Sequence, residues 1–378
     1  ILLSLETVES VMSVNYDAGF YDNDTELHDY DMEFRKLADE VYKQPCDLFS
    51  YMERHDIPAG DRDKVQEAVQ LDIEILNTAF VLEDARIFEE YARWLYRLLL
   101  PVMAQCPEDG LRNMVWRHFK QVGDCASRVM NKNDGMKAVR LTDLGARAAA
   151  GEYGKGTCKK EWKPEKYESQ VRQYLDSLLA SDTRTAVSLV TGYLKEGIPL
   201  RDIYGDIIAE SMRRVGDLWH ENVISVDKEH YCTSVTQLAL SRMYPVIFGQ
   251  KRRNRKMMAA CVGSELHEMG ARMVADLFEY DGWDSIYLGA SVPFNALEEA
   301  MEEHQPQLVA LSVTMPQHLR LCREAADRIH SLFPGCRIAV GGNAFMSTNE
   351  IWRNWKVDVY TRDARQLVSW ADHVLEKG

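Results

Sequence analysis

The feature that most constrains the fold is an alternation of short apolar runs and amphipathic stretches over the last third of the chain. The apolar runs are KMMAACVG, DSIYLG, LVALSVT and RIAVGG, and each ends in small or polar residues. Helical patterns cover 266–280, 294–304, 317–333 and 363–376. Alternating strands and helices are typical of a doubly wound parallel sheet, so residues 251–378 are predicted to form a Rossmann-like or flavodoxin-like domain.

The carboxyl ends of these strands are the expected place for a ligand, because open parallel sheets bind ligands there. The loops that begin at Gly263, Gly289, Ser312 and Gly341 should therefore face one site.

The first of these loops reads GSELHEMG and places Glu265 two residues before His267. A histidine at the ligand edge of a sheet suits metal ligation, and a nearby carboxylate can fix its tautomer and raise its basicity. Gly270 would let a ligand approach the backbone closely. Taken alone, such a pair is more often a surface contact, so the other loops must decide between the two interpretations.

The first two thirds of the chain carry helical periodicity instead. Residues 1–150 repeat apolar residues at helical spacing, which predicts an all-helical domain, and the acidic stretch from Asp17 to Glu33 predicts an irregular, solvated beginning. The sequence GEYGKGTCKKEWKP at 151–164 is predicted to be a linker. Residues 165–250 contain four helical patterns joined by short turns, which is typical of a four-helix bundle.

Composition argues against several classes of partner. The net charge is −14, and the one dense basic run, KRRNRK at 251–256, is interpreted as a solvated segment between domains, so no nucleic-acid partner is expected. The eight Cys form no CxxC pair, which favours reduced thiols over disulfides or a zinc site. No apolar run approaches the ~20 residues that span a bilayer, and the opening ILLSLETVESVMSVN lacks the basic flank of a signal peptide. We expect a cytoplasmic protein without a membrane partner.

Together, the loops of the C-terminal third resemble the cobalamin-binding signature D-x-H-x-x-G, S-x-L, G-G of methionine synthase, methylmalonyl-CoA mutase and their relatives. Glu265 and His267 begin the match, with Glu265 in place of the usual Asp. There are 41 residues between Gly270 and Ser312, and 26 between Thr314 and Gly341.

The resemblance implies that His267 is the lower axial ligand to cobalt. It also implies which residues line the slot for the displaced dimethylbenzimidazole tail, namely Gly270, Ser312, Thr314, Gly341 and Gly342. Thr314 stands where the family has Leu and would put a hydroxyl beside the tail. The alternative is a flavodoxin-like domain without a corrinoid.

Within the predicted bundle, the motif W-H-x8-E-H is similar to the bundle of the CarH family of light-sensing repressors. Trp219, His220, Glu229 and His230 stand at its positions. The resemblance implies that the bundle caps the upper face of adenosylcobalamin, with Trp219 over the upper ligand and Glu229 and His230 in contact with it. After light cleaves the cobalt–carbon bond, His220 would ligate cobalt opposite His267. The alternative is that these are core residues of the bundle.

CarH-type repressors begin with a basic helix-turn-helix domain, whereas residues 1–150 are acidic and helical. The layout resembles the photocobilins, light sensors in which a helical N-terminal domain holds biliverdin close to cobalamin. A bilin needs aromatic side chains for its rings, cations for two propionates, and a His or Asp near its nitrogens. The candidates are the rings Tyr91, Trp94, Trp116, His118 and Phe119 and the cations Arg93, Arg97 and Arg117, while Cys46, Cys106 and Cys125 lack a context for a covalent thioether.

The predicted function is a photoreceptor and not an enzyme, with adenosylcobalamin and biliverdin as cofactors and a light-dependent homo-oligomer as its output. The main alternative is a corrinoid methyl carrier of a methyltransferase system. A carrier would use the same His267, but Trp219 and His220 would obstruct its upper face. A protein-binding module, with or without haem, is the third hypothesis.

Overall fold

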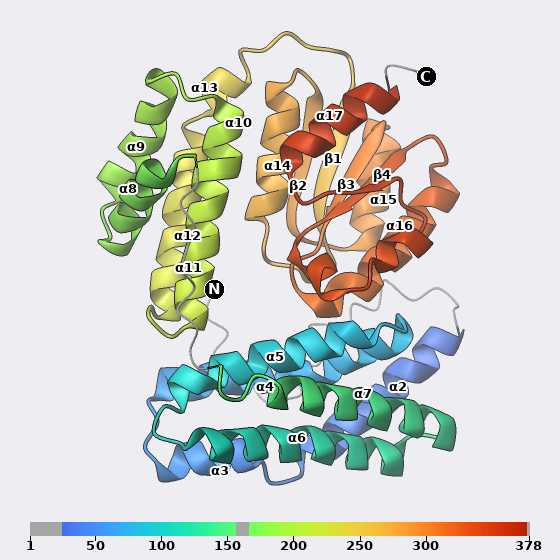
Figure 1. Ribbon diagram of the computed structural model, residues 1–378. Coiled ribbons are helices and arrows are strands. Elements are labelled where there is room, and N and C mark those ends of the chain that lie inside the picture. The colour runs from blue at the N-terminus through green and yellow to red at the C-terminus, as the bar shows by residue number, and fades with distance from the viewer. Residues whose placement is uncertain (1–24, 156–165, 376–378) are drawn as a thin grey trace.

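The structure is a computed structural model that describes residues 25–155 and 166–375, and its elements form three groups (Figure 1). The N-terminal group consists of α2 (Thr25–Tyr42), α3 (Asp47–Arg54), α4 (Ala59–Val81), α5 (Ala85–Val102), α6 (Glu108–Val129) and α7 (Lys132–Ala150). Asp84 begins α5 by accepting the backbone N–H of Arg86 at 3.1 Å, and Asn131 caps α7 in the same way. The expected helical N-terminal region is therefore confirmed.

The acidic stretch from Asp17 to Glu33 was expected to be irregular and solvated, and this is wrong for its second half. Helix α2 begins at Thr25, and Asp31 is buried. Asp31 pairs with Arg320 at 2.5 Å and accepts the Asn77 amide at 3.1 Å. A buried charge requires such partners, and both lie far away in the sequence. Residues 17–24 lie outside the described part of the chain.

The middle group contains the four predicted helical stretches. They are α8 (Glu168–Leu179), α9 (Thr183–Lys195), a continuous run of α10 (Leu200–Asp202), η1 (Ile203–Ile208) and α11 (Ala209–His220), and α12 (Val226–Ser241), which is followed by the short α13 (Tyr244–Ile247). Their apolar sides share one core, which includes the buried rings of Tyr174 and Tyr204. The turn between α11 and α12 places Trp219 and His220 at the end of a helix, close to the N-terminal group (Figure 1).

The third group is a five-stranded parallel sheet of Rossmann-like form, as the alternating pattern predicted. Its strands are β1 (Lys256–Val262), β2 (Asp284–Val292), β3 (Leu308–Ser312), β4 (Arg337–Gly341) and β5 (Val359–Tyr360), in the order β2-β1-β3-β4-β5. The two-residue strand β5 was not predicted, because it is too short to carry a pattern. In register, Cys261, Ser312 and Gly341 lie side by side across the sheet.

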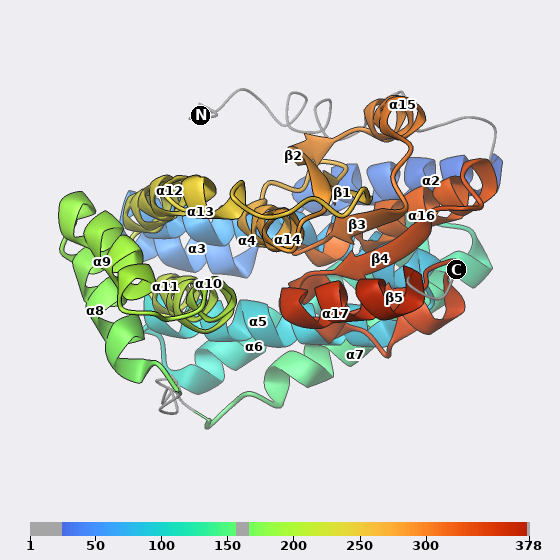
Figure 2. The same ribbon diagram turned by 90° about the horizontal axis from the view of Figure 1, so that it is seen from above.

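Helices cover both faces of the sheet (Figure 2), and they are α14 (Met269–Tyr280), α15 (Phe294–His304), α16 (Leu319–Leu332) and α17 (Ala364–Leu375). Alternate residues of each strand enter different cores because side chains alternate across a strand. Met257 and Ala259 join α14, α17 and the middle helices in one core. Met258 and Ala260 join α15, α16 and the N-terminal helices in the other. Each helical group is therefore continuous with one face of the sheet.

The N-terminal group packs against the segments that follow the carboxyl ends of β3 and β4. These segments include η2 (Pro316–His318) and η3 (Asn343–Ser347). The Thr78 hydroxyl donates to the Gln317 carbonyl at 3.2 Å. The Asn349 backbone N–H donates to the Asp84 carboxylate at 2.6 Å. Helices α4 and α5 thus close over the edge of the sheet at which a ligand is expected.

Among the described residues, no helix combines the length and the apolar character needed to cross a membrane.

Candidate functional site

The loop after β1 holds His267 through the buried carboxylate of Glu265. The Glu265 Oε1 atom lies 2.6 Å from His267 Nδ1 and also accepts the His267 backbone N–H at 2.9 Å. Its Oε2 atom accepts the backbone N–H groups of Thr314 and Met315, both at 2.8 Å. The carboxylate therefore fastens the first loop to the loop after β3, and it fixes the imidazole ring in one orientation.

The charges in this loop favour an ionised Glu265. Burial opposes ionisation, but hydrogen bonds from His267 and from His318, whose Nδ1 lies 3.2 Å from Oε2, hold the pKa of Glu265 well below its usual value. The hydrogen bond to Glu265 raises the pKa of His267, and the negative charge of Glu229 on α12 raises it further. Because Glu229 acts on His267, the start of α12 faces this loop.

The other signature residues gather at the same edge of the sheet. Ser312 and Gly341 are neighbours in register, and Thr314 lies two residues beyond Ser312. Gly342 has a φ of +101°, and a Cβ there would lie 2.1 Å from the Val313 carbonyl oxygen, so only glycine fits. A Cβ at Gly270 would meet nothing within 4 Å, so this part of the first turn of α14 faces open space.

On the opposite side of the site, the Trp219–His220 pair is held by residues of the N-terminal group. The Lys64 ammonium lies 4.3 Å from the centre of the Trp219 ring and donates to the Trp219 carbonyl at 2.5 Å. His220 Nε2 lies 3.2 Å from the Trp94 carbonyl oxygen, and the two rings are 5.5 Å apart. Burial lowers the pKa of Lys64 to about 8, and burial also lowers the pKa of His220.

Glu229 and His230 lie at the start of α12. Glu229 accepts the Thr233 hydroxyl at 3.0 Å, and its carboxylate lies 3.9 Å from His230 Nε2. The His230 side chain is 65% exposed. Further along α12, the Gln237 amide donates to Glu268 at 2.8 Å and so ties this helix to the loop that carries His267.

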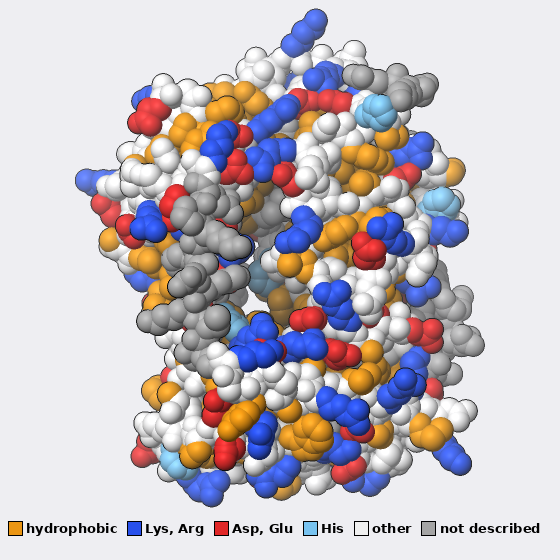
Figure 3. Space-filling model, viewed as in Figure 1, with side chains coloured by type: hydrophobic (Ala, Val, Ile, Leu, Met, Phe, Trp, Pro, Cys, Tyr) orange, Lys and Arg blue, Asp and Glu red, His pale blue; other side chains and the backbone are white. Residues whose placement is uncertain are grey.

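The residues present suit a cobalt corrinoid bound through His267. Such a group would need a metal ligand from the protein, and an imidazole with a fixed tautomer would suit it. The bond from Nδ1 to Glu265 leaves Nε2 for cobalt, and the His267 side chain is 56% exposed. The space-filling view shows the molecule hollowed where the three groups meet, with histidine side chains inside the hollow (Figure 3).

Four of the bilin ring candidates, Tyr91, Trp94, His118 and Phe119, are linked by ring contacts and by Asp72. Tyr91 and His118 are buried and both contact the carboxylate of Asp72. The Tyr91 and Trp94 rings are stacked 6.1 Å apart on α5. Trp116 is 37% exposed, and Phe119 is buried beside His118. The three arginines bind acidic side chains, with Arg93 on Glu89 and Glu90, Arg97 on Glu152, and Arg117 on Asp47.

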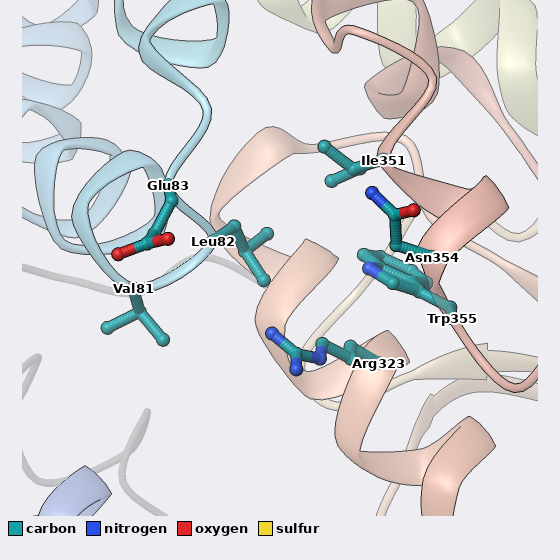
Figure 4. A pocket seen from close by; sticks show the side chains of 7 residues that line it. All are labelled: Val81, Leu82, Glu83, Arg323, Ile351, Asn354 and Trp355. Carbon is teal, nitrogen blue, oxygen red and sulfur yellow. The ribbon is translucent and has the colours of Figure 1, made fainter.

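A separate cavity of about 370 Å³ lies between the turn after α4 and the segment η4 (Ile351–Asn354) (Figure 4). Leu82 and Glu83 line one side, and Arg323 and Trp355 line the other. None of the residues of the cobalamin-binding signature lines this cavity, so the cavity is not part of the site.

Three residues of the site were missed in the sequence. Lys64 donates a hydrogen bond to the Trp219 carbonyl, and the His318 ring contacts the Glu265 carboxylate. Glu268 accepts hydrogen bonds from the Gln237 amide and the Tyr287 hydroxyl. Lys64 is separated from Trp219 by 155 positions, and His318 from Glu265 by 53. Only the folded chain brings such residues together, and no local pattern marks them.

Comparison with known protein families assigns both parts of this site to one class. Residues 255–366 and residues 170–244 each match a family described as a B12 binding domain. The first match covers the sheet with His267, and the second covers the middle helices with Trp219 and His220. Both parts of the site thus resemble B12-binding domains.

Among curated proteins, the chain is similar to the HTH-type transcriptional repressor CarH of Myxococcus xanthus, with 25% identity over 190 residues. This match covers 49% of the chain and 62% of the repressor. Comparison with solved structures finds similarity to the monomethylamine corrinoid protein of Methanosarcina barkeri (TM-score 0.49, 19% identity, 55% of this chain and 99% of that one). A cobalamin-binding protein of Desulfitobacterium hafniense DCB-2 has a TM-score of 0.30 at 19% identity and covers 54% of this chain and 97% of that one.

Proposed function

We propose that the chain is a light sensor that binds adenosylcobalamin through His267. In the dark His220 would not contact cobalt, and it would become a second ligand only after illumination. The observation that carries this proposal is the pairing of two unlike histidines. His267 is fixed by Glu265 through Nδ1, which leaves Nε2 for a ligand, whereas His220 is held through Nε2 by the Trp94 carbonyl. The similarity to CarH supports a sensor.

Adenosylcobalamin would supply a cobalt–carbon bond that light can cleave. Trp219 offers a broad apolar surface for the upper ligand, and Lys64 on its ring limits its movement. Burial lowers the pKa of His220, so its imidazole is neutral at pH 7 and able to ligate a metal. For His220 to reach the upper axial position, its Nε2 has to leave the Trp94 carbonyl.

This exchange would connect the cofactor with the N-terminal helices. Loss of the bond between His220 and Trp94 loosens one of the contacts that join α11 to α5. A two-state interface of this kind is what a small photochemical event can bias. We propose that the response includes a change in homo-oligomeric state, to be measured by light scattering during size-exclusion chromatography in the dark and after illumination.

We also propose biliverdin as a second chromophore, placed beside α5. Tyr91, Trp94 and Arg97 recur at three-residue spacing along this helix, and Trp94 lies next to His220. Co-expression with a haem oxygenase should give the purified protein a red-absorbing band. Purified protein without that band would contradict this part of the proposal and leave the cobalamin part intact.

The decisive experiment is an absorption spectrum of the protein with adenosylcobalamin in the dark and after green light. A sensor should give a spectrum with histidine in place of the benzimidazole, and light should convert it to a stable form with histidine on both sides of cobalt. An unchanged spectrum would refute the proposal. Methyl exchange between bound methylcobalamin and a partner methyltransferase would instead favour a corrinoid methyl carrier.

A further inference from the structure

The N-terminal helices contain a buried Cys–His–Asp arrangement that the cobalamin site does not use. The Cys46 sulfur lies 3.8 Å from Nδ1 of His118, and Nε2 of the same ring contacts the Asp72 carboxylate. Cys46 precedes α3, Asp72 belongs to α4, and His118 belongs to α6. Three helices therefore converge to place a thiol, an imidazole and a carboxylate in line.

Asp72 is fixed as the inner member of this arrangement. Its second carboxylate oxygen contacts the Tyr91 hydroxyl, and Asp72, Tyr91 and His118 are all buried. A buried carboxylate needs partners, and an imidazolium is a suitable one. Burial of His118 opposes its protonation, but the charge and hydrogen bond of Asp72 outweigh this and raise the pKa of His118 to about 10. His118 is thus a cation at pH 7 that presents Nδ1–H to Cys46.

Cys46 has two features of a reactive thiol. It stands at the N-terminal cap of α3 and is partly exposed, so small reagents can reach it. Burial opposes ionisation of the thiol, but His118 and the backbone N–H groups of Phe49 and Leu48 outweigh it and lower the pKa of Cys46. The charged groups beside the arrangement, Asp47 and Arg117, pair with each other at 3.0 Å.

We propose that Cys46 is a peroxide-reactive thiolate, activated by His118 and Asp72, and that it makes the N-terminal helices an oxidant-sensing module. The Cys46 sulfur attacks one oxygen of hydrogen peroxide, the O–O bond breaks, and the leaving hydroxide takes the proton from His118 Nδ1. The products are the sulfenic acid of Cys46, one water and a neutral His118. Sulfur is oxidised by two electrons and the peroxide is reduced.

Cys106 provides a matched control within the same protein. It is also partly exposed and stands just before a helix, α6, and its thiol donates to the Pro107 carbonyl at 3.4 Å. No imidazole activates it, and burial raises the pKa of Cys106. Differences in reagent concentration or protein concentration do not enter a comparison of two cysteines in one sample.

The test is mass-spectrometric labelling of the wild-type protein with limiting iodoacetamide at pH 7. Cys46 should react roughly tenfold faster than Cys106, because the gain in thiolate fraction exceeds the loss of nucleophilicity that accompanies a lower pKa. Between pH 8 and pH 6 the Cys106 rate should fall about tenfold per pH unit, while the Cys46 rate should fall less steeply, because its pKa is lowered and that of Cys106 is raised. Equal rates, or parallel profiles, would overturn the proposal.

A second measurement follows the proposed product. After treatment with hydrogen peroxide, dimedone should label Cys46 and not Cys106, and C46S should abolish that adduct. H118Q, if its circular dichroism matches the wild type, should reduce Cys46 labelling to the Cys106 level. Absence of the dimedone adduct at Cys46 would refute the peroxide chemistry. All these measurements use protein without corrinoid, so they are independent of the light-sensing proposal.

Discussion

Two of the histidine–carboxylate pairs in this molecule, His267 with Glu265 and His118 with Asp72, differ in what surrounds the imidazole. Glu265 holds His267 at the edge of the sheet, where the His267 side chain is 56% exposed and Nε2 has no hydrogen-bond partner within the described residues. Asp72 holds His118 inside the N-terminal helices, where Cys46 takes the remaining nitrogen. In both pairs the carboxylate raises the pKa of the histidine.

The difference shows that the carboxylate sets the charge and tautomer of the ring, while exposure decides its use. An imidazole with one fixed and one free nitrogen can bind a metal. An imidazole with both nitrogens occupied and little solvent contact acts only on its neighbours, by holding them in place or by passing on a proton. His267 should therefore matter for the corrinoid and little for folding, and His118 should matter for folding and little for the corrinoid.

The largest expected effect is that of H118A on stability. Removing one partner of a buried charged pair leaves Asp72 without its cation, so the free energy of unfolding should fall by about 3 to 5 kcal/mol. Urea unfolding followed by circular dichroism measures this. A loss below about 1 kcal/mol would show that the buried pair is not a charged one.

The same experiment has a pH signature. Because the pKa of His118 is raised in the folded state to about 10, from a usual value of 6.5, its contribution is complete below pH 6.5. The contribution is lost as the pH rises through 10. The difference in stability between wild type and H118A should therefore shrink between pH 6.5 and 10, and a difference that grows over this window would contradict the assignment.

The next largest effect is that of H267A on the corrinoid. Loss of the axial ligand should weaken dark binding of adenosylcobalamin by more than about 100-fold, beyond the range for outer residues of metal sites. Because Glu265 loses one partner but keeps three backbone N–H donors, the free energy of unfolding should fall by no more than about 1 kcal/mol. Spectrophotometric titration and urea unfolding test both halves. Retained affinity in H267A would refute the ligand assignment.

A smaller effect on the corrinoid is expected from E265Q. In the wild type, one Glu265 oxygen bonds the His267 ring, and the other accepts the backbone N–H groups of Thr314 and Met315. The glutamine amide has only one acceptor oxygen, so it cannot keep both sets of hydrogen bonds. We expect dark affinity to fall by about 10-fold. Stability should also fall, by about 1 to 3 kcal/mol, because a buried donor loses its acceptor. Affinity equal to that of the wild type would show that Glu265 does not tune His267.

The smallest effect on dark binding is expected from H220A. His220 bonds the Trp94 carbonyl and not the corrinoid in the dark, so the dark affinity should stay within about twofold of the wild type. After green light, however, the stable form with two histidine ligands should be absent from the spectrum. Normal formation of that species in H220A would leave the Trp219–His220 motif with no role beyond packing.

The arrangement of strands and helices could be predicted because it depends on local patterns. The four apolar runs from Lys256 to Gly341 became β1 to β4, and the helical periodicities between them became α14, α15 and α16. The prediction failed where a long-range contact overrides local character. Asp31 lies in an acidic stretch that looks solvated, yet its partner Arg320 makes it a buried helical residue.

The residues of the site likewise fall into those that the sequence indicates and those that only the fold brings together. Glu265, His267 and Gly270 lie within six positions, so the sequence marks them as a unit. Glu229 and His230 are marked by their spacing from Trp219 and His220. In the lower half, the carboxylate reaches its imidazole across one residue. In the upper half, Lys64 and Trp94 reach Trp219 and His220 across more than a hundred positions, and no pattern announces them.

By itself, the amino-acid sequence determined the parallel sheet, the helices before it, and the histidine that would meet cobalt, because periodicity and short spacing act within one or two elements. The tertiary structure alone decided that the N-terminal helices close over the carboxyl edge of the sheet and hold Trp219 and His220. It also decided that Cys46, Asp72 and His118 form a buried arrangement. These contacts depend on how three separate helices pack, and packing is fixed by the whole core and not by any one segment.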